Sequence, residues 1–212
     1  MGNLWTEAYK YKTWLQVEIA ACEAMAELGQ IPTEAVVTIK EKADFDPQRI
    51  LEIEATVKHD VIAFLTNVNE YVGDAGRYIH LGMTSSDVLD TALALQLTAS
   101  LEVILKHVAA LIEAIRSQVK THKYTVMVGR SHGIHAEPIT FGFKLAGWLA
   151  EMLRHQSRLW QLKDELAVGQ ISGAVGTYAN IDPQVEAIAC AKLGLKPDTA
   201  STQVISRDRH AN

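Results

Sequence analysis

The sequence predicts an all-α protein, with an N-terminal helical domain followed by the first part of a long central helical bundle. Four long stretches contain neither glycine nor proline, namely residues 3–28, 48–72, 83–128 and 148–168. Strand-rich proteins need turn residues far more often than this. Within these stretches the apolar residues recur every three or four positions, as on one face of a helix. We therefore expect an N-terminal helical domain over residues 1–84 and a partial bundle domain, truncated at its C-terminus, over residues 85–212.

The first two helices are expected within residues 3–28 and from Pro47 to about residue 72. The second has a clear start signal, because Asp46 can cap the helix and proline suits its first position. The segment Lys58-His59-Asp60 is expected in the middle of this second helix.

The longest expected helix begins near Ser85 or Ser86 and reaches His122. Either serine can cap its start, and the acidic residues Asp87 and Asp90 suit the positive end of the helix dipole. Helices of this length belong to bundles.

The remaining elements follow from glycine and proline. A fourth helix should span roughly residues 140–167, and residues 169–180, which contain three glycines, predict a loop. A short helix should start at Pro183 and end at Gly194. Residues 206–212 have the pattern of a cap and a first helical turn, which predicts a helix that is interrupted there.

The composition is that of a folded protein: hydrophobic residues make up 48 % and charged residues 21 % of the 212 positions. The net charge of −5 argues against nucleic acid as a partner. The N-terminus does not have the pattern of a signal peptide, and no apolar run suggests a membrane span. Cys22 and Cys190 lie in apolar helical patterns, so we expect two reduced core cysteines in a cytoplasmic protein.

Two polar segments contain histidine, one in the middle of the second expected helix and one at the start of the longest expected helix. For Lys58-His59-Asp60, a solvated helix face with one packed histidine is the simpler interpretation. Residues 79–87 lie where backbone N–H groups and the hydroxyls of Thr84 and Ser85 could hold a carboxylate or phosphate. Ordinary capping would also explain the serines and Asp87, but not His80 or Gly82.

A third polar segment, residues 129–138, is expected as a loop between two long helices, where function often concentrates. His132, His135 and Glu137 could bind a metal, although the histidines are three apart rather than the four of the usual helical zinc pattern. A structural loop anchored by Arg130 is a second interpretation. A third is an acid–base site, because histidine exchanges protons near neutral pH.

Five segments, in the same order along the chain, resemble the adenylosuccinate lyase family of the fumarase/aspartase superfamily: residues 59–64, 82–91, 129–142, 171–180, and Gln203 with 207–210. Each segment alone is modestly specific, but five in register are highly specific. The ending Ala136-Glu137-Pro138 of the third segment indicates the adenylosuccinate branch rather than fumarase or argininosuccinate lyase.

The resemblance implies β-elimination of fumarate from adenylosuccinate, giving AMP, and from the succinylated carboxamide ribotide (SAICAR), giving AICAR. It also implies a homotetramer that needs neither a metal nor an organic cofactor. The proton donor to the leaving nitrogen would be His132. The residues that bind the small-molecule substrate would be Lys58, His59, Asp60, Thr84, Ser85 and Gln203.

The sequence departs from the family pattern at several points. Lys58 stands where the family usually has arginine, which removes bidentate recognition of an anion. Ser131 replaces the usual threonine but keeps the hydroxyl. The family's N-terminal Arg-Tyr pair and its downstream loop with the general-base serine have no counterpart in these residues, so we expect an N-terminal fragment without lyase activity of its own. Two alternatives stay open: another lyase or cycloisomerase of the superfamily, and a non-catalytic helical assembly fragment.

Overall fold

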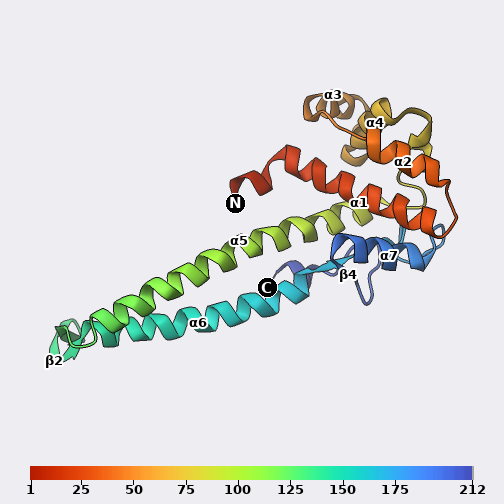
Figure 1. Ribbon diagram of the computed structural model, residues 1–212. Coiled ribbons are helices and arrows are strands. Elements are labelled where there is room, and N and C mark those ends of the chain that lie inside the picture. The colour runs from red at the N-terminus through yellow and green to blue at the C-terminus, as the bar shows by residue number, and fades with distance from the viewer. Residues whose placement is uncertain (212) are drawn as a thin grey trace. The chain divides into compact units, whose positions relative to one another are not determined.

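The computed structural model describes residues 1–211, and helices dominate this part of the chain (Figure 1). The α-helices are α1 (Glu7–Glu27), α2 (Thr33–Lys42), α3 (Pro47–Val57), α4 (Asp60–Val72), α5 (Ser85–Thr121), α6 (Phe141–Leu166) and α7 (Pro183–Leu193). Short 3-10 helices are η1 (Gly2–Trp5), η2 (Gly73–Tyr78) and η3 (Arg207–His210). The strands pair as β1 (Val126–Ser131) with β2 (Ile134–Thr140), and β3 (Val168–Gly169) with β4 (Lys196–Pro197). The predicted all-α class is confirmed.

The chain forms two compact units. Unit 1 combines Met1–Ala99 with the chain from Glu165 onward, and unit 2 is Ser100–Asp164. Helix α5 begins in unit 1 and ends in unit 2. The division at residues 84 and 85 stays a prediction.

The core of unit 1 is built around packed aromatic rings. The Tyr11 and Phe64 rings stack with centroids 5.8 Å apart, and Trp14 meets Phe64 edge-on at 5.4 Å. Cys22 and Cys190 are buried and unpaired, as expected for core thiols. Burial raises the pKa of each to about 12, so both stay uncharged at neutral pH.

Unit 2 is an antiparallel pair formed by the second part of α5 and by α6, joined by the β1–β2 hairpin. At one end of the pair, Lys163 forms an ion pair with Glu102 at 3.0 Å. At the other end, the Gly142 N–H donates to the His122 carbonyl at 2.8 Å. A Cβ on Gly142 would lie 2.7 Å from that carbonyl oxygen, so only glycine allows this close approach.

Two expectations about local structure are wrong. Residues 58–60 are not in the middle of one helix, because α3 ends at Val57, α4 starts at Asp60, and Lys58 and His59 lie between them. Residues 129–138 are not an irregular loop but most of a β-hairpin. The other expected boundaries hold closely, including Asp46, whose carboxylate caps α3 by accepting from the Gln48 N–H at 2.9 Å. The expected turn after Ser206 is a 3-10 helix, and Asn212 lies outside the described residues.

Helix α5 is long and apolar enough to cross a membrane when judged by length and composition alone. By this measure the expectation that no apolar run could span a membrane does not hold for α5. Half of the relevant window is buried in the structure, as in the core helix of a soluble protein, and one such helix is weak evidence for a membrane.

Candidate active site

Residues 58–60 form a sharp junction between two helices in unit 1. Lys58 ends α3 with left-handed backbone angles of φ 57 and ψ 31, and His59 is the N-cap of α4. A left-handed residue other than glycine costs about 1–2 kcal/mol, which the surrounding structure must offset. Lys58 and His59 are both exposed. The break therefore presents polar side chains that a continuous helix would have spread around its circumference.

His59 lies between Asp60 and Ser85. Its Nδ1 accepts a long hydrogen bond of 3.4 Å from the Ile62 N–H, so the neutral ring carries its proton on Nε2. That Nε2 lies 3.5 Å from the Ser85 hydroxyl. The same Nδ1 lies 3.3 Å from the Asp60 carboxylate. The imidazole thus lies within reach of groups on both sides.

Thr84 and Ser85 stand at the start of α5, where the buried carboxylate of Asp87 fixes the backbone. Asp87 accepts from the N–H groups of Thr84 at 3.0 Å, Ser172 at 3.1 Å and Gly173 at 3.0 Å. Burial raises the pKa of Asp87 above its usual value, and these hydrogen bonds only partly offset the increase. Asp87 therefore joins the Thr84 backbone to the glycine-rich segment 169–180.

The backbone of Gln203 is held to the same group of residues through Gln170. The Gln170 side-chain nitrogen lies 3.3 Å from the Asp87 carboxylate, 3.0 Å from the Thr202 carbonyl and 3.1 Å from the Gln203 carbonyl. Asp90, one turn into α5, accepts from the Ile205 N–H at 2.9 Å. Ile205 is thus bonded directly to α5, and Thr202 and Gln203 are bonded to it through Gln170, while the Gln203 side chain is exposed.

His80 and Gly82, which capping could not explain, have structural explanations. A Cβ on Gly82 would lie 2.2 Å from the Asn180 carbonyl oxygen, and its φ of +74 is left-handed, so both the space and the backbone require glycine. His80 bonds to Glu18, which is 1 % exposed. Sequence reasoning missed Glu18 and Gln170, although a carboxylate between Val17 and Ile19 is a visible signal of a buried polar contact.

His132 is at the tip of the unit 2 hairpin. The Ser131–Ile134 pair closes a two-residue turn in which His132 has φ 52 and Gly133 has φ 75. Positive φ at both central residues is the requirement of a type I′ turn. The His132 side chain is exposed, and no hydrogen bond of its ring is found within residues 1–211.

The alternative interpretations of the hairpin gain no support. Within residues 1–211 no three His, Cys, Asp or Glu side chains gather closely enough to hold a metal, and this includes His132, His135 and Glu137. Arg130 is exposed, and its guanidinium anchors nothing in the described part of the chain.

The structure brings together part of the expected site. In unit 1, His59 meets Ser85, Asp60 and Thr84 adjoin this pair, and Gln203 is joined to it through Gln170 and Asp87. Lys58 is at the same helix junction. His132 belongs to unit 2.

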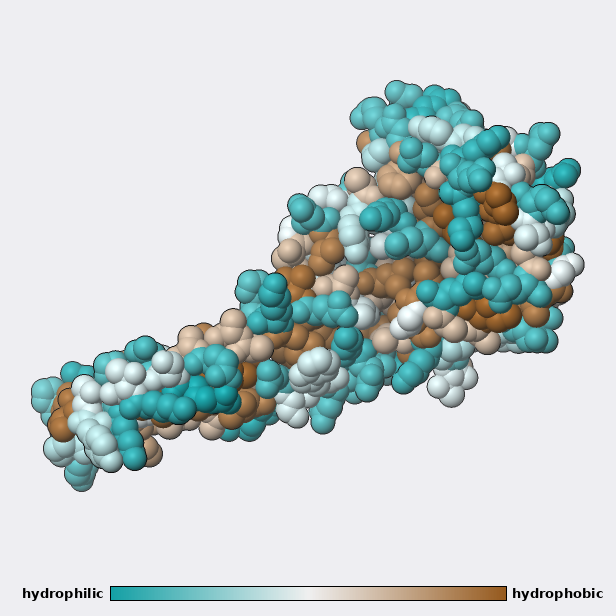
Figure 2. Space-filling model, in the orientation of Figure 1, coloured by the Kyte–Doolittle hydropathy of each residue, from teal (hydrophilic) through white to brown (hydrophobic). Residues whose placement is uncertain are grey.

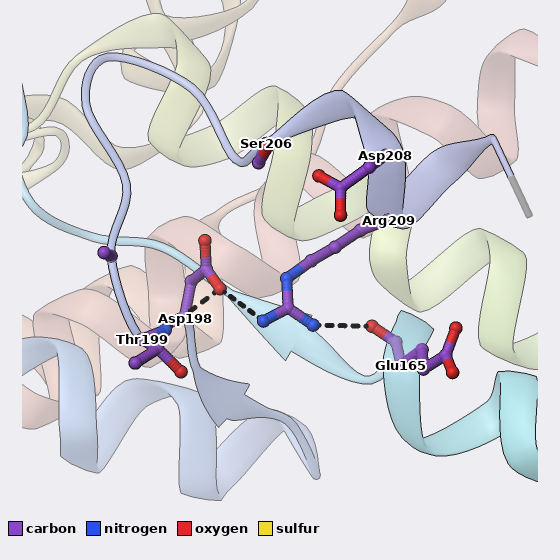
Figure 3. A pocket seen from close by; sticks show the side chains of 7 residues that line it. Glu165, Asp198, Thr199, Ser206, Asp208 and Arg209 are labelled. Atoms are coloured by element: carbon purple, nitrogen blue, oxygen red, sulfur yellow. Dashed lines mark hydrogen bonds and ion pairs between the residues drawn. The ribbon is translucent and has the colours of Figure 1, made fainter.

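A separate cavity of about 470 Å³ in unit 1 contains none of the expected site residues (Figure 3). Figure 3 shows Arg209 between Asp198 and Glu165: the guanidinium lies 2.8 Å from the Asp198 carboxylate and 3.2 Å from the Glu165 carbonyl. The second oxygen of Asp198 is buried without a hydrogen-bond partner in the described residues.

The sequence and fold of the chain match a known class of enzymes. A family model described as "Lyase" matches residues 1–212, and the chain therefore belongs to this lyase family. The chain is 77 % identical over 211 residues to the adenylosuccinate lyase of Synechocystis sp., and 52 % identical over 212 residues to that of Bacillus subtilis. It covers 49 % of each of these relatives, so the chain spans about half the length of the curated proteins it matches.

Solved structures agree with the sequence relatives. The structure superimposes with a TM-score of 0.93 on a fumarate lyase from Mesorhizobium sp. BNC1, at 29 % identity, covering 99 % of this chain and 51 % of the other. The TM-score is 0.89 with the 3-carboxy-cis,cis-muconate lactonizing enzyme of Pseudomonas putida, at 32 % identity, covering 98 % of this chain and 49 % of the other.

Proposed function

We propose that this chain is the N-terminal part of an adenylosuccinate lyase, which releases fumarate from adenylosuccinate to give AMP and from SAICAR to give AICAR. The observation that carries the proposal is the 77 % identity to an adenylosuccinate lyase along the entire chain. The coverage of 49 % of that relative supports an N-terminal fragment.

The reaction is a β-elimination. A base removes a proton from the carbon beside a succinyl carboxylate, the resulting carbanion is delocalised into that carboxylate, and the carbon–nitrogen bond then breaks. A positioned acid must protonate the departing nitrogen, and His132 is proposed as this acid. Its exposed place in a two-residue turn leaves the ring free to reach a substrate.

The substrate would be held by the unit 1 segments. The Thr84 and Ser85 hydroxyls at the start of α5 suit the succinyl carboxylates, because a helix start attracts anions. Lys58, His59 and Asp60 would bind beside them, and the proximity of His59 to Ser85 supports this placement. Gln203 is a further proposed substrate contact, and we propose that the chemistry requires no metal or organic cofactor.

The test is fumarate release from adenylosuccinate, measured for the 212-residue chain and for the full-length polypeptide that contains it. We expect turnover by the full-length polypeptide and none by the 212-residue chain. Full-length protein that is inactive on adenylosuccinate and SAICAR would refute the function, and turnover by the short chain would refute its inactivity.

A second candidate is a cycloisomerase or another lyase of the same superfamily, since the chain is 32 % identical to a muconate lactonizing enzyme. Assays with argininosuccinate and with 3-carboxymuconate separate these activities from the first proposal.

We also propose a cytoplasmic homotetramer. The two free, buried cysteines are typical of a reducing compartment. Unit 2 exposes large apolar side chains, among them Phe143 at 71 % and Trp148 at 50 %, and Figure 2 shows apolar surface between the hydrophilic groups. Such surfaces commonly mark contacts between subunits.

A further inference from the structure

A carboxylate on α1 holds the loop that leads into α5. The Glu18 Oε2 accepts from the His80 backbone N–H at 2.9 Å, and its Oε1 lies 2.6 Å from the His80 Nδ1. The two residues are 62 positions apart in the sequence, so this is a tertiary contact rather than local capping. Both oxygens of one carboxylate thus bind the main chain and the side chain of a single residue.

The contact fixes a backbone shape that the sequence would otherwise disfavour. His80 has a left-handed φ of 64, and for a residue other than glycine this persists only when neighbouring groups enforce it. The chain then turns at Gly82 against the Asn180 carbonyl and reaches Thr84, whose N–H binds Asp87. The conformation of residues 80–84 is therefore fixed at both ends by buried carboxylates, Glu18 and Asp87.

The charges around the His80 ring favour a lasting bond to Glu18. Burial lowers the pKa of the imidazole, but the hydrogen bond and charge of Glu18, together with the charge of Asp87, outweigh this, so the pKa lies above its usual value. Cys22, one turn further along α1, has a pKa raised to about 12 by burial and carries no competing charge at neutral pH.

We propose that Glu18 is a positioning residue for substrate binding, acting through His80 to set the place of Thr84 and Ser85. The inference rests on the proposed function, in which these two hydroxyls bind the succinyl carboxylates. Because the proposed proton donor, His132, belongs to the other unit, loss of Glu18 should weaken substrate binding more than it slows the chemical step.

The kinetic test is Glu18→Gln in the full-length polypeptide. The amide replaces one of the two acceptor oxygens with a donor and removes the charge, so we expect KM for adenylosuccinate to rise by about tenfold or more, with kcat changed by less than about threefold. The matched control is Glu23→Gln, which removes a charge from the same helix but from ion pairs with Lys40 and Lys192. A purely structural role of Glu18 would lower the amount of active enzyme, with kcat reduced and KM unchanged, and that result would overturn the inference.

A second readout does not depend on activity. In ¹⁵N NMR spectra of the 212-residue chain, Glu18→Gln should shift the Thr84 and Ser85 amide resonances and the His80 ring nitrogens, whereas Glu23→Gln should not. Inactive wild-type protein with these shifts present would refute the proposed function but retain the positioning role. Unmoved Thr84 and Ser85 resonances would refute the positioning role. If Glu18→Gln does not fold, Glu18→Asp keeps the charge but shortens the reach, and the same changes are expected.

Discussion

The carboxylate of Asp87 lies 3.1 Å from the backbone nitrogen of Ser172, although 85 positions separate the two residues along the chain. Both groups are buried. This hydrogen bond joins the start of α5 to the glycine-rich segment, and with its neighbours it organises the substrate side of the proposed site.

Replacement of Asp87 by asparagine should destabilise unit 1. The Asp87 Oδ2 accepts from two backbone N–H groups, those of Thr84 and Gly173, and an amide nitrogen there would face both donors. We expect Asp87→Asn to lower the free energy of unfolding by about 3 kcal/mol, measured by urea denaturation. Asp74→Asn, at an exposed position of η2, should change it by less than about 0.5 kcal/mol. Equal effects of the two substitutions would contradict the prediction.

Substitution by alanine should destabilise the protein to different extents at two glycines that have left-handed backbone angles. At Gly82 the new Cβ would lie 2.2 Å from a backbone oxygen, whereas at Gly194, with a φ of +71, it would meet nothing within 4 Å. We expect Gly194→Ala to cost about 1–2 kcal/mol for the backbone alone, and Gly82→Ala to cost more than about 3 kcal/mol. Thermal unfolding of both variants checks the order, and a cost for Gly194→Ala that matches or exceeds that of Gly82→Ala would show it to be wrong.

Replacement of His132 by asparagine should separate stability from activity. Asparagine followed by glycine is the preferred pair for a type I′ turn, so the hairpin should be as stable as before or more stable by about 0.5 kcal/mol. Loss of the proposed proton donor should lower kcat of the full-length polypeptide by about 10²–10⁴-fold. The control is His107→Asn, at an exposed position of α5 in unit 2, which should leave kcat unchanged. Full activity of the His132 variant would remove this residue from the mechanism.

The contribution of His80 to the stability of unit 1 should decrease as the pH rises above the unfolded pKa of about 6.5. Its folded pKa is raised, so the ion pair with Glu18 contributes fully below the unfolded pKa of about 6.5 and is lost as the pH rises through the higher folded value. Urea denaturation at a series of pH values measures the slope of the free energy of unfolding against pH. Glu18→Gln should flatten it, and an unchanged slope in that variant would assign the effect to other groups.

Self-association should depend on the apolar surface of unit 2. Trp148, on α6, is 50 % exposed, and a glutamate there should weaken association of the chain. Gln161→Glu adds the same charge at an exposed polar position of the same helix and should have little effect. Sedimentation velocity over a range of protein concentrations compares the two variants, and indistinguishable profiles would argue against this surface as the contact.

The sequence predicted the ends of a helix well where a capping residue, a proline or a glycine marks them. Asp46 with Pro47 and Pro183 with Gly194 mark helix ends through caps and backbone preferences that act locally. The break at Lys58 and His59 carries no glycine or proline, and it forms because His59 caps α4 while Lys58 adopts a left-handed conformation. Local propensity alone could not reveal it.

The candidate site was predictable only where local signals along the chain define it. The start of α5 at Ser85 followed from local signals, but the hairpin did not, because its turn residues are His132 and Gly133 rather than the usual asparagine and glycine. The roles of Glu18 and Gln170 depend on contacts between distant parts of the chain. No local pattern specifies which loop a buried carboxylate will bind.

The hydrogen bonds that Asp90 accepts from the Ile205 N–H and the Arg207 guanidinium also constrain how the protein is made. They span 115 and 117 positions, and all of unit 2 lies between the partners. At about 5–20 residues per second, a ribosome needs on the order of ten seconds to synthesise the intervening chain. Throughout that interval the Asp90 carboxylate lacks these partners, so unit 1 can finish folding only after unit 2 has been translated.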